Sequence, residues 1–393
     1  MRTFTKDEKQ FIVEHLQQQP ATLMLQASRY PGLPVAELVQ QVQARQKAMS
    51  KLPAWAQNPD LVFPANVSVE QSSSEATAAF KASLVAGKLL VDLTGGFGAD
   101  SYYFSKTVAQ VIHVEQNQEL SEIASHNFTI LGATNIKTIA TTAAAFLETF
   151  NGHADYLYLD PARRGDRSEK LHLLRDCEPD ILTLLPVLLQ KADKVLLKAS
   201  PMLDIDLAVS QLGKVAKVWV VAVQNECKEV LYLLEQNPPA TLETEAVNIK
   251  ADGSISVFTF TPAQEQTIHP PYTDPQQFIY EPNAAILKAG AYKSITRQFA
   301  VGKLHPNSHL YTSEVLVSDF PGRIFRCVGV SKYSKKELLA KLPQKQANIT
   351  VRNFPDTVAN IRKKTGIKEG GNHYLFFTTD MHQKPIVLFC EKA

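Results

Sequence analysis

The sequence is poor in cysteine, lacks long apolar runs and carries little net charge. Its four cysteines, Cys177, Cys227, Cys327 and Cys390, form no C-x-x-C pair, which argues against a zinc site or a disulfide scaffold and favours reduced cytosolic thiols. No apolar h-region follows Met1, and no uncharged apolar run reaches about 18 residues, so neither a signal peptide nor a membrane span is expected. These absences predict a cytoplasmic protein with no metal and no membrane partner.

What the sequence does contain fits a folded chain of two or three domains. Its 393 residues are 45% hydrophobic and 20% charged, which is typical of globular proteins with a sizeable core. The net charge of +2 is unevenly divided. The segment from Arg323 to the end has 14 Lys and Arg against 5 Asp and Glu, an excess of +9, so the preceding part carries −7. A basic segment on an acidic chain suggests a polyanionic partner, and a solvated basic face is the alternative.

Residues 1–65 are predicted to form a small helical domain. Thr5-x-x-Glu8 matches a capping box, and apolar residues follow it at helical spacing. A second match, Ser72-x-x-Glu75, is expected to open another helix. The polar start of that helix is either an ordinary cap or an edge of a ligand pocket.

Residues 66–262 alternate between short apolar runs and helix-length gaps, the pattern of an open parallel sheet. Only residues 224–228 separate the last two runs. They are too few for a crossover of about a dozen residues, so the seventh strand is expected to return antiparallel as a hairpin. This arrangement fits a Rossmann-like, seven-stranded methyltransferase sheet better than an NAD-binding domain, which would continue parallel. The seven expected strands are 89–93, 111–115, 136–140, 156–160, 194–198, 218–223 and 229–234.

The rest of the chain predicts a hairpin and two α+β segments. Asp252-Gly253 marks the hairpin turn, and four prolines before residue 276 mark a linker. Residues 276–322 are a connecting segment with an expected helix over 284–299. Residues 323–393 show a βαβαββ order, which suggests a small ferredoxin-like α+β module.

The strongest ligand signal lies in residues 89–101. A short buried strand runs into Asp92 and then into Gly95-Gly96-Phe97-Gly98, a tight turn that opens a helix. The dinucleotide fingerprint G-x-G-x-x-G has Ser101 here in place of its third glycine, and an acid at position 92 would repel a pyrophosphate. The same acid would accept the ammonium group of S-adenosylmethionine, which has no phosphate. A glycine-rich turn without a ligand is the alternative.

Polar residues at the ends of neighbouring strands extend this candidate site. Glu115 lies about 20 residues beyond the glycines, the spacing at which an acid contacts ribose hydroxyls. Asp160-Pro161-Ala162-Arg163-Arg164 ends the fourth strand, where the Asp-Pro bond fixes the carboxylate at the rim. Its arginines can bind phosphate or stack on a base. Lys198 ends the fifth strand and Asn225 lies in the hairpin. Ordinary surface turns are the alternative for each.

The run from Val91 to Asp100, Glu115 and the Asp160-Pro161-Ala162-Arg163-Arg164 segment resemble bacterial class I S-adenosylmethionine-dependent methyltransferases with a C-terminal THUMP-like domain. The resemblance covers residues 60–393, because Val351-Arg352-Asn353-Phe354-Pro355 and the basic residues after it are similar to that domain. It implies a Rossmann-like methyltransferase domain, a ferredoxin-like segment over 276–322 and a THUMP-like end over 323–393. THUMP domains are associated with tRNA-modifying enzymes, so the resemblance also implies RNA, either tRNA or rRNA, as the substrate.

These observations predict that S-adenosylmethionine is the cofactor and that a nitrogen of an RNA base is methylated. Enzymes that methylate exocyclic amines resemble one another in an Asp-Pro-Pro-aromatic tetrad. Ala162 and Arg163 occupy the last two positions here, and Arg163 is expected to stack on the base instead. A small-molecule or protein methyltransferase and a non-catalytic RNA-binding protein are the alternatives.

The predicted site residues fall into three groups. The catalytic group is Asp160, Pro161 and Arg163. The cofactor group is Asp92, Thr94, Gly95, Gly96, Gly98, Asp100, Glu115 and Gln116, with Gln71 and Ser74 from the edge of the preceding helix. The substrate group is Arg164, Lys198, Asn225, Arg352, Arg362, Lys363, Lys364 and Lys368, of which the last five are expected to contact phosphates.

Overall fold

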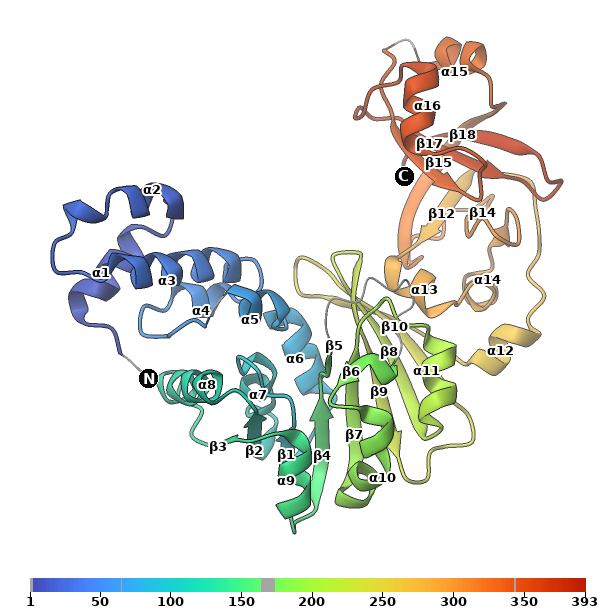
Figure 1. Ribbon diagram of the computed structural model, residues 1–393. Coiled ribbons are helices and arrows are strands. Elements are labelled where there is room, and N and C mark those ends of the chain that lie inside the picture. The colour runs from blue at the N-terminus through green and yellow to red at the C-terminus, as the bar shows by residue number, and fades with distance from the viewer. Residues whose placement is uncertain (1–2, 65, 164–173, 343) are drawn as a thin grey trace. The chain divides into compact units, whose positions relative to one another are not determined.

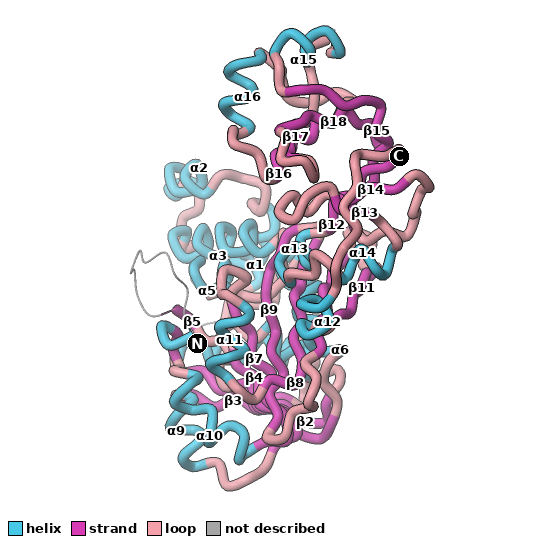
Figure 2. The backbone as a smooth tube through the Cα atoms, turned by 90° about the vertical axis from the view of Figure 1, so that its right-hand side faces the viewer, coloured by secondary structure: helices cyan, strands magenta, loops and turns pink. Residues whose placement is uncertain are grey.

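The fold is described from a computed structural model (Figures 1 and 2). Within the described residues, no helix has both the length and the apolar character needed to cross a membrane. Residues 3–64, 66–163, 174–342 and 344–393 are described. The chain divides into two compact units, the first containing Met1–Val218 and Glu229–Ala240 and the second containing Trp219–Lys228 and Thr241–Ala393.

The N-terminal region is helical, as predicted, and its first helix starts at the predicted capping box. The Glu8 N–H donates to the Thr5 hydroxyl, and the Thr5 N–H donates to Glu8 Oε2 at 2.8 Å. Ile12 and Val42, from the first and third helices, are fully buried in one apolar cluster. The helices are α1 (Lys6–Glu14), α2 (Pro20–Leu25), α3 (Val35–Ala48), α4 (Pro53–Gln57) and α5 (Asn66–Gln71), with a 3₁₀ turn at Ala27–Arg29.

The second predicted capping box, Ser72-x-x-Glu75, is wrong, because the helix is capped two residues later, at Ser74. Helix α6 (Glu75–Ser83) begins after Ser74, whose hydroxyl accepts a hydrogen bond from the Thr77 N–H at 3.2 Å. Ser72 does not cap this helix, because its hydroxyl donates to the Val69 carbonyl at 2.8 Å. The corrected start leaves Ser73 immediately before the cap, where its hydroxyl joins the site described below.

A nine-stranded sheet has the order β11-β10-β8-β9-β7-β4-β1-β2-β3. Parallel pairing joins β1 to β2 and β4, β2 to β3, and β4 to β7, whereas β9 pairs antiparallel with β7. The predicted antiparallel return of the seventh strand is therefore confirmed. Helices α9, α10 and α11 lie along one side of the strands in Figure 2. These elements are β1 (Gly87–Asp92), α7 (Ala99–Phe104), β2 (Val108–Glu115), α8 (Gln118–Ile130), β3 (Ile136–Ala140), α9 (Ala143–Thr149), β4 (Ala154–Leu159), β5 (Ala162–Arg163), β6 (Cys177–Glu178), α10 (Ile181–Lys191), β7 (Ala192–Ala199), α11 (Ile205–Leu212), β8 (Val215–Val223) and β9 (Glu226–Glu235).

The sheet has nine strands where seven are predicted. The hairpin predicted around Asp252-Gly253 forms as β10 (Glu243–Ile249) and β11 (Ile255–Phe260), which pair antiparallel. This hairpin also extends the sheet beyond β8. Without it, β8 would be an edge strand with a row of unpaired N–H and C=O groups. A turn signal identifies a hairpin in the sequence, but it does not identify the strand against which the hairpin will pair.

The second unit contains a seven-stranded sheet with the order β13-β14-β12-β15-β18-β17-β16. The predicted βαβαββ order is present, and its long first strand, β15, pairs with β12 on one side and β18 on the other. The single helix predicted over 284–299 is wrong, because Gly290 adopts φ +79° and ends the first of two short helices. The elements are α12 (Pro262–Thr267), β12 (Phe278–Pro282), α13 (Ala284–Ala289), α14 (Ser294–Phe299), β13 (Gly302–Lys303), β14 (Tyr311–Ser313), β15 (Gly322–Lys332), α15 (Lys335–Lys341), β16 (Asn348–Arg352), α16 (Val358–Thr365), β17 (Tyr374–Thr379) and β18 (Pro385–Lys392).

Candidate active site

The turn between β1 and α7 is built around the buried carboxyl group of Asp92. One carboxylate oxygen accepts a hydrogen bond from the Ser101 hydroxyl at 2.6 Å, and the other accepts from the Thr94 N–H at 3.1 Å. The Ser101 hydroxyl also meets Nδ1 of the buried His113 at 2.9 Å. Burial raises the pKa of Asp92 to about 7 and lowers the pKa of His113 to about 3. The Ser101 that replaces a third glycine thus ties α7 to the ends of two strands.

Two glycines of this turn are required by close packing, and a third faces open space. A Cβ atom at Gly95 would lie 2.2 Å from His113 Cε1, and one at Gly98, where φ is +90°, would lie 2.5 Å from Phe128 Cζ. Among the described residues, a Cβ at Gly96 would meet only the Thr94 carbonyl, at 3.9 Å. The turn therefore packs tightly at Gly95 and Gly98 and is open at Gly96.

Glu115, at the end of β2, fixes the conformation of this turn. Its Oε2 accepts a hydrogen bond from the Gly96 N–H at 2.8 Å, and its Oε1 accepts from the Asn117 N–H at 2.8 Å. Each carboxylate oxygen has a second lone pair, so the side chain can still accept hydrogen bonds from a ligand. Glu115 thus combines a structural contact with the position expected of a ribose-binding acid.

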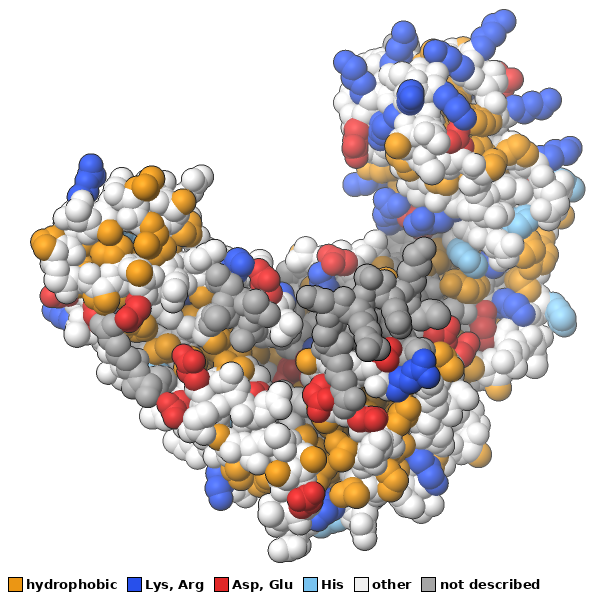
Figure 3. All heavy atoms as spheres, viewed as in Figure 1, with side chains coloured by type: hydrophobic (Ala, Val, Ile, Leu, Met, Phe, Trp, Pro, Cys, Tyr) orange, Lys and Arg blue, Asp and Glu red, His pale blue; other side chains and the backbone are white. Residues whose placement is uncertain are grey.

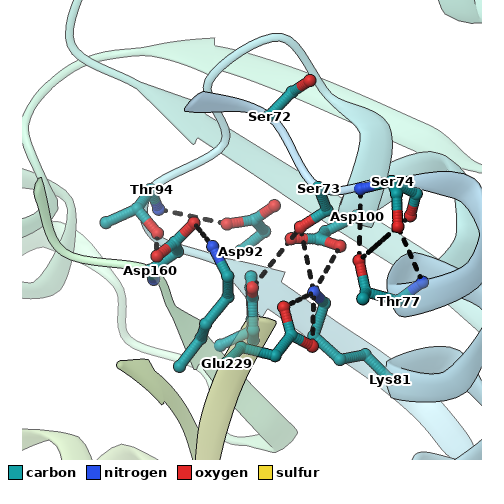
Figure 4. Close-up of polar contacts among 12 residues, drawn as sticks. Ser72, Ser73, Ser74, Thr77, Lys81, Asp92, Thr94, Asp100, Asp160 and Glu229 are labelled. Atoms are coloured by element: carbon teal, nitrogen blue, oxygen red, sulfur yellow. Dashed lines mark hydrogen bonds and ion pairs between the residues drawn. The ribbon is translucent and has the colours of Figure 1, made fainter. Parts of the chain in front are cut away.

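A buried lysine connects α6 to α7 and β9 beside the turn (Figure 4). Lys81 is fully buried, and its ammonium group donates to both carboxylate oxygens of Glu229 at 3.1 and 2.9 Å. It also donates to the Ser73 hydroxyl at 2.9 Å and lies 3.2 Å from Asp100 Oδ1. Asp100 Oδ2 accepts from the hydroxyls of Ser73 and Tyr158, each at 2.8 Å. Burial alone would raise the pKa of Asp100, but Lys81 and these hydrogen bonds outweigh it and leave that pKa lowered.

Asp160 is held at the end of β4 by one backbone contact and one carboxylate contact. The Asp160 N–H donates to the Thr94 hydroxyl at 2.6 Å, and the Lys198 ammonium, from β7, pairs with Asp160 Oδ2. Burial would lower the pKa of Lys198, but Asp160 and two further carboxyl groups raise it above its usual value. Among the described residues, two cations share this edge of the sheet with five carboxyl groups, an acidic balance that favours a cationic ligand even though the pKa of Asp92, about 7, leaves that group partly protonated near neutral pH. The cations are Lys81 and Lys198, and the carboxyl groups belong to Asp92, Asp100, Glu115, Asp160 and Glu229.

The structure brings most of the predicted cofactor and catalytic residues to the carboxyl ends of β1, β2, β4 and β7. Gln71 and Gln116 are exposed, and the Ser74 hydroxyl caps α6. Pro161 is half-buried next to Asp160, and Arg163 lies in β5. Arg164 lies outside the described residues. The residues brought together are Asp92, Thr94, Gly95, Gly96, Gly98, Asp100, Glu115, Asp160 and Lys198.

Four residues of this cluster were not predicted from the sequence, namely Ser73, Lys81, Tyr158 and Glu229. The spacing of Lys81 from Ala78 gives a weak indication of burial, because the two residues lie on the same face of α6. Its partner Glu229 lies 148 positions away in the chain, and no local pattern can predict such a pairing.

Three of the predicted phosphate-binding residues, Arg362, Lys363 and Lys364, lie in α16 of the second unit. Lys and Arg side chains gather over α15 and α16 (Figure 3). Glu281 pairs with Arg352 at 2.7 Å and also with Arg323. Lys364 pairs with Asp356 at 2.6 Å. Arg362 donates to the Ile367 and Ala347 carbonyls, whereas Lys363 and Lys368 are exposed. Asn225, in the hairpin between β8 and β9, accepts a hydrogen bond from the Ala284 N–H.

The chain is similar to known methyltransferases and to two known domain families. Residues 278–321 match a family model for a ferredoxin-like domain, and residues 322–392 match one for a THUMP-like domain. A solved structure of a protein from Porphyromonas gingivalis W83, assigned as a methyltransferase, is 33% identical with a TM-score of 0.89 over 100% of both chains. An uncharacterized RNA methyltransferase from Thermotoga maritima is 29% identical over 97 residues, which is 25% of this chain and 22% of that protein. That match thus spans about a fifth of the relative. With its sheet order and its glycine turn, this chain belongs to the S-adenosylmethionine-dependent methyltransferases that carry a C-terminal THUMP-like domain.

Proposed function

We propose that this protein transfers a methyl group from S-adenosylmethionine to a nitrogen of a base in RNA, either tRNA or rRNA. The observation that carries the proposal is the position of Asp160. Thr94 holds its backbone N–H and Lys198 holds its carboxylate, directly beside the turn that contains Asp92 and Gly96. A ligand held at that turn would have its reactive end next to an oriented carboxylate.

Three features of the turn fit S-adenosylmethionine. Gly96 leaves open space beside it, Glu115 retains lone pairs for ribose hydroxyls, and the surrounding carboxyl groups favour the positively charged ammonium and sulfonium groups. Asp92, Gly96 and Glu115 are therefore the residues proposed to hold it. When bound, S-adenosylmethionine supplies an electrophilic methyl group. The acidic groups would favour it over a dinucleotide, whose pyrophosphate they would repel.

Asp160 is proposed to orient the nitrogen that accepts the methyl group. Lys198 occupies Oδ2, so Oδ1 can accept a hydrogen bond from an N–H of the base and can take up its proton as the new N–C bond forms. The ion pair also fixes the direction of the carboxylate, and positioning supplies much of the rate in such displacements. Arg163 is proposed to stack on the base.

RNA is the proposed substrate class because of the second unit. Its last 71 residues, from Arg323, carry an excess of +9, and Lys363 and Lys368 extend into solvent. The Thermotoga maritima relative is an RNA methyltransferase by name. Exposed lysines suit phosphate contacts, which hold a nucleic acid in place without reading its sequence.

Two measurements test the cofactor and the role of Asp160 separately. Calorimetric titration of the full chain with S-adenosylhomocysteine should give saturable binding, and an absence of heat at micromolar concentrations would contradict the proposal. Asp160→Asn should retain this binding and lower the transfer rate about 100-fold or more. Asp193→Asn changes an exposed carboxylate paired with His153 and should change neither quantity. Equal transfer rates in all three proteins would refute the role of Asp160.

A further inference from the structure

Cys327 and Cys390 are distant in the sequence but face each other across β15 and β18, where the antiparallel register aligns them directly. The Cys327 N–H donates to the Gln277 carbonyl, on the other side of β15, at 2.8 Å. The Ala393 N–H donates to the Ile324 carbonyl at 3.3 Å. Because hydrogen-bonded and non-hydrogen-bonded pairs alternate along antiparallel strands, both contacts make Cys327 and Cys390 a non-hydrogen-bonded pair. Cα atoms in regular pairs of this kind lie about 4.5 Å apart, within the range that a disulfide spans. The register shifts only after this pair, between Cys327 and Gly329, and the three pairs from Phe325 to Cys327 are in regular register.

The two thiols differ in accessibility and acidity. Cys390 is fully buried in an apolar cluster with Phe325 and Leu388, whereas Cys327 packs at the partly exposed margin of that cluster. The hydrogen bond with Cys390 lowers the pKa of Cys327 to about 7, and the charge of Lys341 adds to this effect. The same hydrogen bond and burial raise the pKa of Cys390. Cys327 is therefore the thiol that an oxidant reaches first and finds as a thiolate.

We propose that Cys327 and Cys390 form a reversible oxidation site that closes to a cross-strand disulfide when the protein meets hydrogen peroxide. The Cys327 thiolate attacks one peroxide oxygen, the O–O bond breaks, and Cys327 becomes a sulfenic acid while hydroxide leaves. That hydroxide takes up the proton that Cys327 had released and becomes water. The Cys390 sulfur then attacks the Cys327 sulfur, the S–O bond breaks, and the hydroxyl leaves as water with the Cys390 proton. The two thiols lose two electrons in total, and the peroxide is reduced to two water molecules.

The remaining cysteines provide an internal control. Cys177 lies in β6 of the first unit, and Cys227 lies at the start of β9. Neither shares the register that joins Cys327 to Cys390. A general oxidation of the protein would modify these cysteines as well, whereas the proposed site links only one pair.

The test is peptide mass spectrometry on the full chain after exposure to hydrogen peroxide and alkylation of the remaining thiols. We expect one linked peptide pair that joins positions 327 and 390, two hydrogen atoms lighter than the reduced pair and restored by a thiol reductant. Cys227→Ser should give the same link. Cys390→Ser should instead leave Cys327 as a sulfenic acid that dimedone traps. Free, alkylated Cys327 and Cys390 in oxidised wild-type protein, or a link from Cys327 to position 177 or 227, would overturn the proposal.

Discussion

Asp92 is a fully buried carboxyl group whose charge is poorly solvated in the folded protein. Burial raises its pKa from 3.8 to about 7. The folded state therefore binds a proton more tightly than the unfolded state does. From this group alone, the free energy of unfolding is highest below pH 4 and falls as the pH rises towards 7.

Replacement by asparagine removes this pH dependence. We expect Asp92→Asn to become more stable relative to wild type as the pH rises from 4 to 8, by at most about 4 kcal/mol, since each pKa unit corresponds to about 1.4 kcal/mol. Urea unfolding of both proteins at pH 4, 5, 6, 7 and 8 measures the difference. A stability difference that stays constant across this range would show that Asp92 has an ordinary pKa.

Lys81 is the only described cation that lies fully buried between two carboxylates of this site, those of Asp100 and Glu229. Lys81→Met should therefore destabilise the protein by about 3 to 5 kcal/mol, because both acids would lose their counter-charge. Adding Glu229→Gln should recover part of the loss, since one buried charge is then removed. Chemical denaturation of the single and double variants measures both effects, and a double variant less stable than Lys81→Met would contradict the ion-pair interpretation.

Individual site residues could be predicted from the sequence where they directly follow a strand in the same short segment. Asp92, Glu115 and Asp160 each follow an apolar run directly, and strand ends gather at one edge of a parallel sheet. Lys81 and Glu229 lie in different elements, and their pairing depends on tertiary packing that the sequence does not display.

Among the elements, the strands of the large sheet were predictable because each is a short apolar run bounded by turn residues. The third expected strand, 136–140, coincides with β3, and the others differ only at their ends. Predicted helix ends were wrong where the sequence offers more than one residue that can begin or end the helix. Ser72 and Ser74 can both cap a helix, and the contacts of Ser74 with Thr77 and of Ser72 with Val69 decide between them. Gly290 is compatible with helix continuation in the sequence, but it adopts a left-handed conformation.

The turn after β1 allows a matched comparison of two glycines. Gly98 and Gly132 both adopt positive φ, +90° and +71°, but only at Gly98 would a Cβ atom collide with a neighbour, Phe128 at 2.5 Å. Gly132→Ala should cost about 1 kcal/mol of stability from backbone strain alone. Gly98→Ala should cost more and should also weaken S-adenosylhomocysteine binding, because the turn must shift. Thermal unfolding and calorimetry compare them, and equal effects would argue against tight packing of the turn.

At the scale of the whole molecule, charge separates the chain into an acidic part and a basic C-terminal part. The excess of +9 after residue 322 was evident from composition. The composition did not show which basic side chains are available to a partner. Lys364 and Arg352 form ion pairs with Asp356 and Glu281 within the fold. Ion pairing within the fold removes some cations from the candidate surface and leaves others exposed.

Salt dependence tests this surface. In the double variant Lys363→Ala/Lys368→Ala, RNA affinity should fall, and the slope of log affinity against log salt should become shallower by roughly 1.5, since each phosphate contact contributes about 0.7 to 0.9. Lys88→Ala/Lys137→Ala removes two exposed lysines of the first unit and should leave the slope unchanged. Filter binding at several salt concentrations measures both variants, and identical slopes would exclude Lys363 and Lys368 from phosphate contact.

Transfer of a labelled methyl group tests directly whether this protein methylates RNA. The full chain is incubated with S-adenosylmethionine labelled in its methyl group, together with total tRNA, rRNA or a small-metabolite extract, and parallel reactions contain Asp160→Asn. We expect label in RNA, on a base nitrogen after digestion to nucleosides, and its loss in the variant. Label that appears only in metabolites, or RNA labelled equally by both proteins, would contradict it.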